Sequence, residues 1–248
     1  MKTQSHKNTE GLSYKGIPVH AAPGLHEAII AKIQESNFKT NAQVLELGCG
    51  SGALTLRLCE NDFRVRAVDQ SLDSFTPQTN AEAEELDLNK DFSEKFRDKD
   101  YDLIVAVEVI EHLENPQHFL RQVAALMSPE TRLWISFPNM FLYINVWKFP
   151  KDNTVICWNI EQYWEMGHQT MLPAWLFEQH LTKAGLSFIS RHFVAPLDLS
   201  EAHPNPIKRL LSKSILKMLE LLIPTVTREQ RVASCVLYEI RASNDHEK

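Results

Sequence analysis

The stretch VLELGCGSGALTL, residues 44–56, decides the fold, because it places an apolar strand, a glycine loop and the start of a helix in direct succession. The loop has glycine at three alternate positions, Gly48, Gly50 and Gly52. Glycine permits a tight turn and lets a ligand approach the backbone closely, and the amino end of the following helix favours an anionic group. Together with Ala53, the spacing also satisfies the dinucleotide pattern G-x-G-x-x-G/A, which is weak evidence when it stands alone.

Apolar strands and helical stretches alternate on both sides of this loop, which predicts a doubly wound parallel α/β sheet. The strands are expected at residues 42–47, 63–69, 81–87, 101–109, 132–138, 186–195 and 231–242. The helices are expected at residues 23–38, 51–61, 115–127, 172–185 and 205–224.

The chain of 248 residues is long enough for one large domain, which we place at residues 25–248. Residues 1–24 are expected to be a loosely ordered polar arm or lid. Residues 139–170 interrupt the alternation with many aromatic residues and are expected to form a small cap, either lining an acceptor pocket or covering the core. The amphipathic stretch 204–224 is expected to be a helix.

Composition narrows the possible partners and the location. The formal net charge of −6 argues against a general polyanion binder, so nucleic acid is an unlikely partner. The four cysteines form no CxxC pair, and the polar start MKTQSHKNTE has no apolar run after it. These features favour reduced thiols and a cytoplasmic location.

Three acidic residues near the loop are candidates for cofactor binding. Glu46 comes two residues before the first glycine, where its carboxylate can face a cationic ligand. Asp69 ends the second strand at a spacing that suits the ribose hydroxyls of either nicotinamide or adenosyl cofactors. Asp87 can accept a hydrogen bond from an adenine amino group, and a solvated surface acid is the competing interpretation.

These elements, LELGCGSG with AVD, LDLN and YDLIVAVEVIEH, resemble the class I S-adenosylmethionine-dependent methyltransferases over residues 25–195. The resemblance implies a seven-stranded sheet whose last strand is antiparallel. It implies that S-adenosylmethionine is the cofactor and that residues of the loop cradle its methionine part, with Glu46 behind them. It implies that Asp69 binds the ribose. The remaining residues that it assigns to the cofactor are Gly48, Cys49, Gly50 and Gly52 in the loop, and Asp87 with Leu88 beside the adenine.

Two details depart from the family. The segment QSLDSFTPQTN after Asp69 is turn-like where the family often has a full helix, so the adenine side is expected to be more open. The segment LMSPETRLW lacks the Pro-Gly-Gly turn that is common before the fifth strand.

The stretch AVEVIEHLENP, residues 106–116, places Glu108, Glu111 and His112 at positions i, i+3 and i+4, directly after the fourth strand. If the chain turns helical there, the three side chains share one face. Ligands bind at the carboxyl ends of strands in open sheets, and two carboxylates with an imidazole suit Mg²⁺ or Mn²⁺. His168, just before the helix at 172–185, offers a second imidazole.

EVIEH followed by a distant histidine resembles the metal-dependent O-methyltransferases, which include the small-RNA 2′-O-methyltransferases and, more loosely, the ubiquinone-pathway O-methyltransferases. By this resemblance, the metal ligands are Glu108, Glu111, His112 and His168. Without a metal, a base among Glu111, His112 and His168 can remove the acceptor proton. Each of these residues taken alone would more often be structural.

The sequence therefore predicts methyl transfer from S-adenosylmethionine to a hydroxyl of an acceptor with vicinal oxygens. A sugar or glycan precursor comes first, a quinone or other lipid-linked phenol second, and an RNA 3′ end third. A nicotinamide-dependent oxidoreductase and a non-catalytic binding protein are the alternatives of other classes.

The late helix combines an apolar face with a basic stripe of Arg209, Lys213 and Lys217. Such a helix can make peripheral contact with an anionic membrane through residues 206–223. More often, an apolar face of this kind packs on the sheet or on a second subunit, and we expect that packing here, with a homodimer as one form of it.

Overall fold

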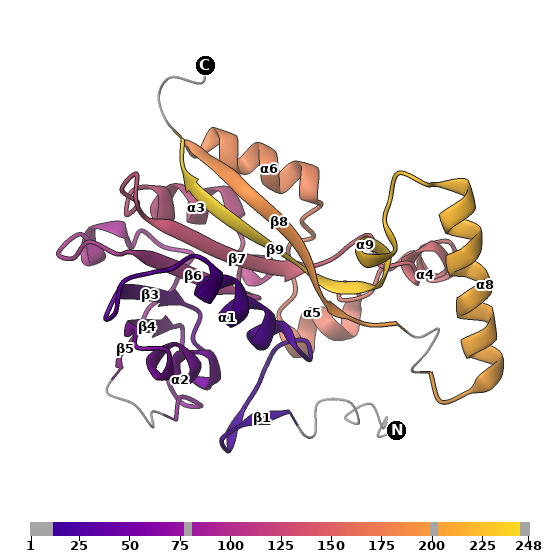
Figure 1. Cartoon of the computed structure of the whole chain (residues 1–248), viewed down its shortest axis with the longest axis horizontal. Helices are drawn as coiled ribbons and strands as arrows, with labels where there is room; N and C mark the ends of the chain where they lie inside the picture. Colours follow the sequence, from indigo (N-terminus) through magenta and orange to yellow (C-terminus); the bar gives the residue numbers. More distant parts are fainter. Residues whose placement is uncertain (1–11, 77–80, 199–202, 244–248) are drawn as a thin grey trace.

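The centre of the molecule is a seven-stranded sheet, seen in a computed structural model that describes residues 12–76, 81–198 and 203–243 (Figure 1). Its strands are β3 (Gln43–Leu47), β4 (Arg64–Asp69), β5 (Glu82–Glu85), β6 (Leu103–Val107), β7 (Arg132–Pro138), β8 (Leu186–Pro196) and β9 (Ala233–Ala242). They lie in the order β5-β4-β3-β6-β7-β9-β8, in which the first five pair in parallel and β9 is antiparallel to both neighbours. The expected sheet with an antiparallel last strand is confirmed.

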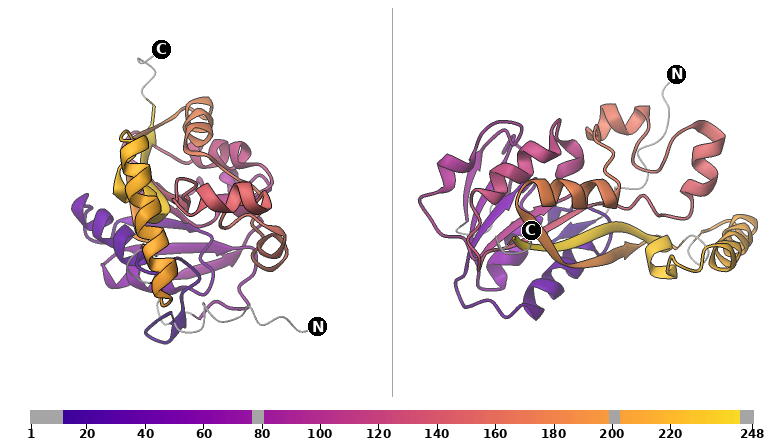
Figure 2. Two further views of the ribbon diagram at one scale, coloured as in Figure 1. Left: turned by 90° about the vertical axis from the view of Figure 1, so that its right-hand side faces the viewer. Right: turned by 90° about the horizontal axis from the view of Figure 1, so that it is seen from above.

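Helices cover both faces of this sheet (Figure 2). On one face, α1 (Leu25–Glu35) and α2 (Ala53–Glu60) bury apolar side chains against β3, β4 and β6. On the other face, η1 (Ser93–Phe96), α3 (Pro116–Ala124) and α6 (Ala174–Lys183) pack over the strands. The central strand β3 is therefore enclosed on both sides, and all of its residues after Gln43 are buried.

The described part of the amino-terminal segment is a small hairpin, which corrects the expectation of a loose arm for those residues. Strands β1 (Ser13–Tyr14) and β2 (Ile17–Pro18) pair antiparallel, and Ile17 is buried against Ala53 and Leu56 of α2. Ser51 of the glycine loop donates a hydrogen bond to the carbonyl of Pro18. The hairpin therefore lies beside the glycine loop, whereas residues 1–11 are outside the described residues.

The segment 139–170, which is expected to form a cap, extends with the late helix beyond one end of the sheet (Figure 1). It contains α4 (Asn145–Asp152) and α5 (Ile160–Met166), and it is followed later in the chain by α8 (Pro206–Leu222) and α9 (Arg228–Val232). Side chains of α8 and α9 pack with Leu142 and Tyr143 in a small apolar cluster. Of the two packings expected for the late helix, on the sheet or on a second subunit, the first is wrong, because α8 rests on residues 142–143 and on α9 instead.

None of the helices in the described ranges is both long enough and apolar enough to cross a membrane.

Candidate active site

Backbone hydrogen bonds hold the glycine loop close to the sheet. The N–H groups of Gly48 and Cys49 both donate to the carbonyl of Val68 in β4, at 2.7 and 3.0 Å. Gly48 has a φ of 81°, and a side chain there would collide with Val109, which follows β6. Glycine is therefore required at this position both for its conformation and for the close approach of two segments.

Gly50, in the middle of the loop, has open space above it. Its φ is 50°, and an added Cβ would meet no protein atom within 4 Å. Its N–H donates to a carboxylate oxygen of Asp69 at 2.7 Å. The end of β4 and the glycine loop are thus joined at an open position, which a bound ligand can approach.

Glu46 lies behind the loop and is almost completely buried, with 2% of its surface exposed. Thr55 of α2 donates a hydrogen bond to it at 2.6 Å. Burial, with a smaller contribution from the negative charge of Asp69, raises the pKa of Glu46 to about 8, and the hydrogen bond from Thr55 opposes this shift. A cationic group bound nearby would favour the ionised carboxylate.

Asp87 and Leu88 lie beyond the end of β5. Asp87 accepts a hydrogen bond from the backbone N–H of Asn89 at 3.0 Å and pairs with Lys90 at 3.3 Å, and both contacts lower its pKa. Leu88 is buried. The carboxylate of Asp87 therefore already has partners within its own turn, which is compatible with either of the roles expected from the sequence.

Glu108 departs from the geometry that its spacing predicts. Its φ is 54°, and the helical turn η2 (Ile110–His112) begins only two residues later. The backbone is thus left-handed at Glu108, so its side chain does not share one helical face with Glu111 and His112. Instead, its carboxylate accepts a hydrogen bond from Ser136 at 2.8 Å and one from the thiol of Cys235 at 3.5 Å. Burial raises the pKa of Glu108 to about 7.

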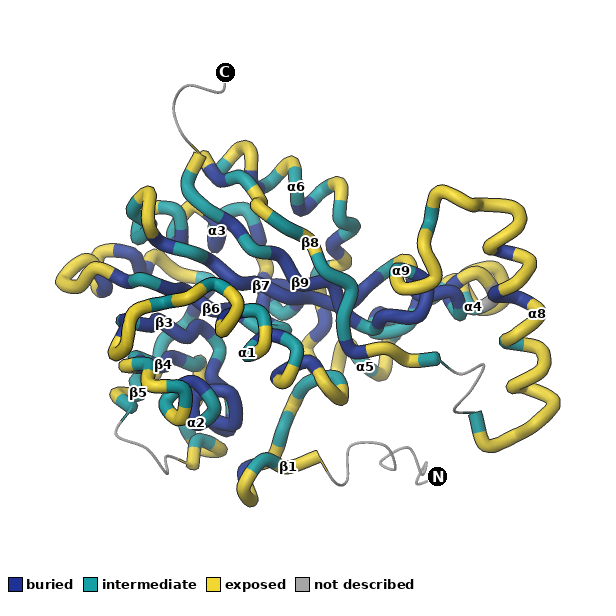
Figure 3. Tube along the Cα trace, viewed as in Figure 1, coloured by how far each residue is buried: buried dark blue, intermediate teal, exposed yellow. Residues whose placement is uncertain are grey.

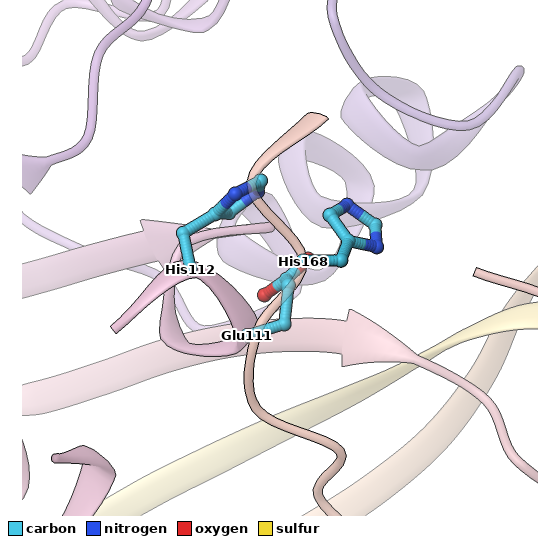
Figure 4. A group of neighbouring side chains, drawn as sticks. All are labelled: Glu111, His112 and His168. Atoms are coloured by element: carbon cyan, nitrogen blue, oxygen red, sulfur yellow. The ribbon is translucent and has the colours of Figure 1, made fainter. Parts of the chain in front are cut away.

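Glu111, His112 and His168 gather at one point (Figure 4). Each offers one ligand atom, and these atoms lie within 4.8 Å of one another. Glu111 has no exposed surface, and within the described ranges neither of its carboxylate oxygens accepts a hydrogen bond from another residue. Burial, and then the charge of Glu108, raise the pKa of Glu111 well above its ordinary value. An acid this deeply buried without a partner indicates a place that a ligand completes.

His168 is fixed in this position by contacts along its own segment. Its Nδ1 lies 2.9 Å from the carbonyl of Cys157, to which it donates as the Nδ1–H tautomer. The N–H groups of Gln169 and Thr170 donate to the carbonyl of Glu111 at 3.1 and 3.0 Å. These bonds join the segment after α5 to the segment after β6, and they leave the Nε2 lone pair of His168 free to bind a cation or a proton.

The two imidazoles form an edge-to-face pair with ring centroids 4.7 Å apart. Burial lowers the pKa of His112, and the neighbouring His168 lowers it further. Burial lowers the pKa of His168 as well, with its bond to Cys157 opposing the shift. Both rings are therefore neutral near pH 7, which is the form that binds a metal or accepts a proton.

Residues 20–194 match the model of a family described as a methyltransferase domain, and this range is more than half of the chain. The chain belongs to this methyltransferase family. The resemblance to class I S-adenosylmethionine-dependent methyltransferases expected from the sequence is confirmed.

Curated relatives of this methyltransferase include two enzymes named ubiquinone biosynthesis O-methyltransferase. The one from Rickettsia typhi is 34% identical over 109 residues, which cover 42% of this chain and 44% of the relative. The one from Rickettsia bellii is 32% identical over 108 residues, covering 41% of this chain and 45% of the relative. The chain thus spans less than half of the length of the curated relatives that it matches.

Solved structures show the same fold at low identity. A SAM-dependent methyltransferase from Archaeoglobus fulgidus has a TM-score of 0.59 and 17% identity, covering 87% of this chain and 94% of that one. The magnesium protoporphyrin IX methyltransferase of Synechocystis PCC 6803, solved with bound SAH, has a TM-score of 0.54 and 15% identity, covering 88% of this chain and 82% of that one.

Some residues that shape the methyltransferase site have no recognisable pattern in the sequence. Phe75 lies so close to Gly52 that a side chain there would contact its ring. Ser136 and Cys235, from β7 and β9, hold Glu108, and Cys157 orients His168. Each acts through a contact between distant segments, so only the fold reveals it.

Proposed function

We propose that this protein transfers the methyl group of S-adenosylmethionine to a hydroxyl that has a second oxygen beside it, with a divalent cation held by Glu111, His112 and His168. One observation carries the proposal. A buried carboxylate, with no hydrogen-bond partner from another described residue, lies beside two neutral imidazoles that are themselves held in place.

The glycine loop fits the proposed cofactor. Gly50 has no side chain, and no protein atom lies within 4 Å of the place where a Cβ would be. A ligand can therefore lie directly against the loop backbone at this position. One carboxylate oxygen of Asp69 accepts a hydrogen bond from the Gly50 N–H. This bond orients the carboxylate toward the same open position. We assign the ribose to Asp69, the methionine part to Gly48, Cys49, Gly50 and Gly52, and the adenine to Asp87 and Leu88. When bound, S-adenosylmethionine supplies an electrophilic methyl carbon on a sulfonium.

The three-residue group fits a cation of borderline hardness. One carboxylate and two imidazoles offer oxygen and nitrogen donors, which suit Mn²⁺ better than the harder Mg²⁺ and would leave positions for other oxygens. A bound cation would lower the pKa of an acceptor hydroxyl and align it. We place Glu108 behind this group, because Ser136 and Cys235 already engage its oxygens while its charge acts on Glu111.

Methyl transfer also requires a place for the acceptor proton. With the cation bound, His112 and His168 would be its ligands, and the acceptor hydroxyl, whose pKa the cation would lower, would release its proton to solvent. Without a cation, either imidazole is neutral near pH 7 and can take the proton as the hydroxyl oxygen forms its new bond. The negative charge of Asp69 raises the pKa of His112, which supports a position of the imidazole pair near the proposed cofactor residues. Proton acceptor and cofactor pocket therefore adjoin one another.

The acceptor class follows from the donor set and from the relatives. A cation with open positions favours two neighbouring oxygens. The curated relatives are O-methyltransferases of ubiquinone biosynthesis, which favours a phenolic quinone precursor over the sugar that the sequence placed first. The net charge of −6 keeps RNA last.

The test is methyl transfer to a simple catechol and to the matching monohydroxy phenol, each with metal-free protein and after addition of Mn²⁺. We expect transfer to the catechol only, lost in EDTA and restored by Mn²⁺, with the protein still folded by circular dichroism. Full activity after exhaustive chelation would contradict the metal assignment and leave His112 or His168 as a metal-free base. Failure to bind S-adenosylhomocysteine, measured separately by calorimetry, would contradict the methyltransferase assignment itself.

A further inference from the structure

Helix α8 leaves most of its apolar surface uncovered. Its buried side chains are confined to Ile215, Leu216 and Leu219, which pack in the cluster with the cap. Figure 3 shows the remainder of the helix exposed at the periphery of the molecule. The exposed apolar side chains of α8 are Ile207 (77%), Leu210 (67%), Leu211 (56%), Met218 (41%), Leu221 (75%) and Leu222 (70%).

These side chains lie on one face. At about 100° per residue, the exposed apolar positions fall within a single arc of the helix that is separate from the packed arc. Arg209, Lys213 and Lys217 form a third arc along one border of the apolar face, and Lys208 lies near the opposite border. The arrangement is an apolar stripe, interrupted by the exposed Ser214, with three basic side chains along one border and Lys208 near the other.

The charge of this helix is opposite to that of the chain as a whole. None of the four basic side chains of α8 is in an ion pair with the residues that the structure describes. The one acid of the helix, Glu220, lies 3.4 Å from Arg228. The whole chain has a net charge of −6, whereas the exposed apolar face of α8 is bordered by basic side chains that form no ion pair with the described residues.

We propose that α8 docks this protein on an anionic lipid surface, with the apolar stripe buried at the boundary of headgroups and acyl chains and the flanking basic side chains at the headgroups. An apolar face bordered by Lys and Arg is complementary to such a surface in both respects. A second copy fits less well, because symmetric pairing of the same face brings two unpaired basic flanks together without acids to meet them. The proposal is independent of the reaction assigned above.

The first test measures co-sedimentation of the full chain with vesicles. The vesicles are pure phosphatidylcholine, or phosphatidylcholine with roughly one third phosphatidylglycerol, at low and at high salt. We expect binding only to the anionic vesicles and weaker binding at high salt. Equal binding to both lipids, or no binding to either, would overturn the proposal.

A charge-reversal pair locates the surface. Lys213→Glu with Lys217→Glu should weaken binding by roughly thirtyfold or more, since each basic side chain near an anionic surface contributes about 1 kcal/mol. The matched control is Arg121→Glu with Lys183→Glu, which changes net charge equally at exposed positions on α3 and α6. Equal loss in both pairs would show a net-charge effect and would overturn the assignment to α8.

An apolar substitution separates lipid from a second copy. Leu221→Gln should weaken vesicle binding about tenfold, because it removes apolar area from the buried stripe, whereas Ile189→Gln, on exposed β8, should not. Leu221 and Ile189 are 75% and 44% exposed, so neither variant should lower the melting temperature. A chain that forms dimers lost in Leu221→Gln, and that binds no vesicles, would assign the stripe to a second copy and overturn the proposal.

Discussion

The candidate site has a cofactor half, formed by the glycine loop with Glu46 and Asp69, and an acceptor half, formed by Glu111, His112 and His168. The two halves are built in different ways. The cofactor half comes largely from one continuous stretch, and its polar groups satisfy one another: Gly50 donates to Asp69, and Thr55 donates to Glu46. The acceptor half is assembled from two segments more than 50 residues apart, and it leaves the carboxylate of Glu111 without a hydrogen-bond partner from any other described residue. The polar groups of the cofactor half thus have partners within the protein, whereas the acceptor half leaves a buried carboxylate that the proposed cation would complete.

The largest expected effect is in the cofactor half. Gly50→Val should abolish measurable binding of S-adenosylhomocysteine at millimolar concentration in calorimetry, because a branched side chain would occupy the space above the loop. Gly185→Val is the matched control, since Gly185 also has a positive φ and open space around it but ends α6. Retained affinity in Gly50→Val would show that the ligand does not lie on this loop.

The next largest effect concerns Glu46, the buried acid of the cofactor half. It shows whether this carboxyl group is neutral when no ligand is bound. Because the pKa of folded Glu46 is about 8 and that of the unfolded chain about 4.5, its contribution to stability is fully present below pH 4.5 and is lost as pH rises through 8. Wild type should therefore lose about 3–4 kcal/mol more than Glu46→Gln between pH 5 and pH 8. Urea unfolding at the two pH values measures this difference, and parallel pH profiles for both proteins would refute it.

Asp69→Ala should weaken S-adenosylhomocysteine binding by on the order of 1–3 kcal/mol, the scale of a hydrogen bond to a charged group. Asp73→Ala, an exposed acid four residues further on, serves as the control and should leave the dissociation constant unchanged. If Asp69→Ala binds as tightly as wild type, the ribose contact lies elsewhere.

The smallest expected effect is a gain in stability, and it concerns the acceptor half. Glu111→Met should raise the free energy of unfolding of the metal-free protein by about 1–2 kcal/mol, because it replaces an unpaired buried acid with an apolar side chain of similar size. The same variant should lose Mn²⁺ binding. Glu114→Met, at an exposed acid nearby, should change neither property. A destabilised Glu111→Met would mean that the carboxylate is satisfied inside the protein.

Much of the cofactor half could be predicted because its information is local. The strand, the glycine loop and the helix follow each other directly, and Asp69 is found by its position at the end of the next strand. The order of the sheet follows from the alternation of strands and helices, together with the resemblance to a known family. In these cases, short-range pattern and long-range fold agree.

The acceptor half was only partly predictable because backbone conformation and distant contacts decide it. Spacing indicates a common site for Glu108, Glu111 and His112, and the family resemblance adds His168. The structure brings Glu111, His112 and His168 together. Nothing in the sequence marks Glu108 as left-handed, so its turn toward Ser136 and Cys235 could not be foreseen. Helix periodicity likewise shows that α8 has an apolar face, but it does not show which surface that face meets.

The most direct test of the central claim is a crystal of the protein grown with S-adenosylhomocysteine, soaked in Mn²⁺ and measured at a wavelength where manganese scatters anomalously. We expect one anomalous peak bonded to Glu111, His112 and His168 at roughly 2.0–2.3 Å, and no such peak in Glu111→Gln. A wild-type crystal saturated with Mn²⁺ that shows no peak at these three residues, or an equal peak in Glu111→Gln, would contradict it.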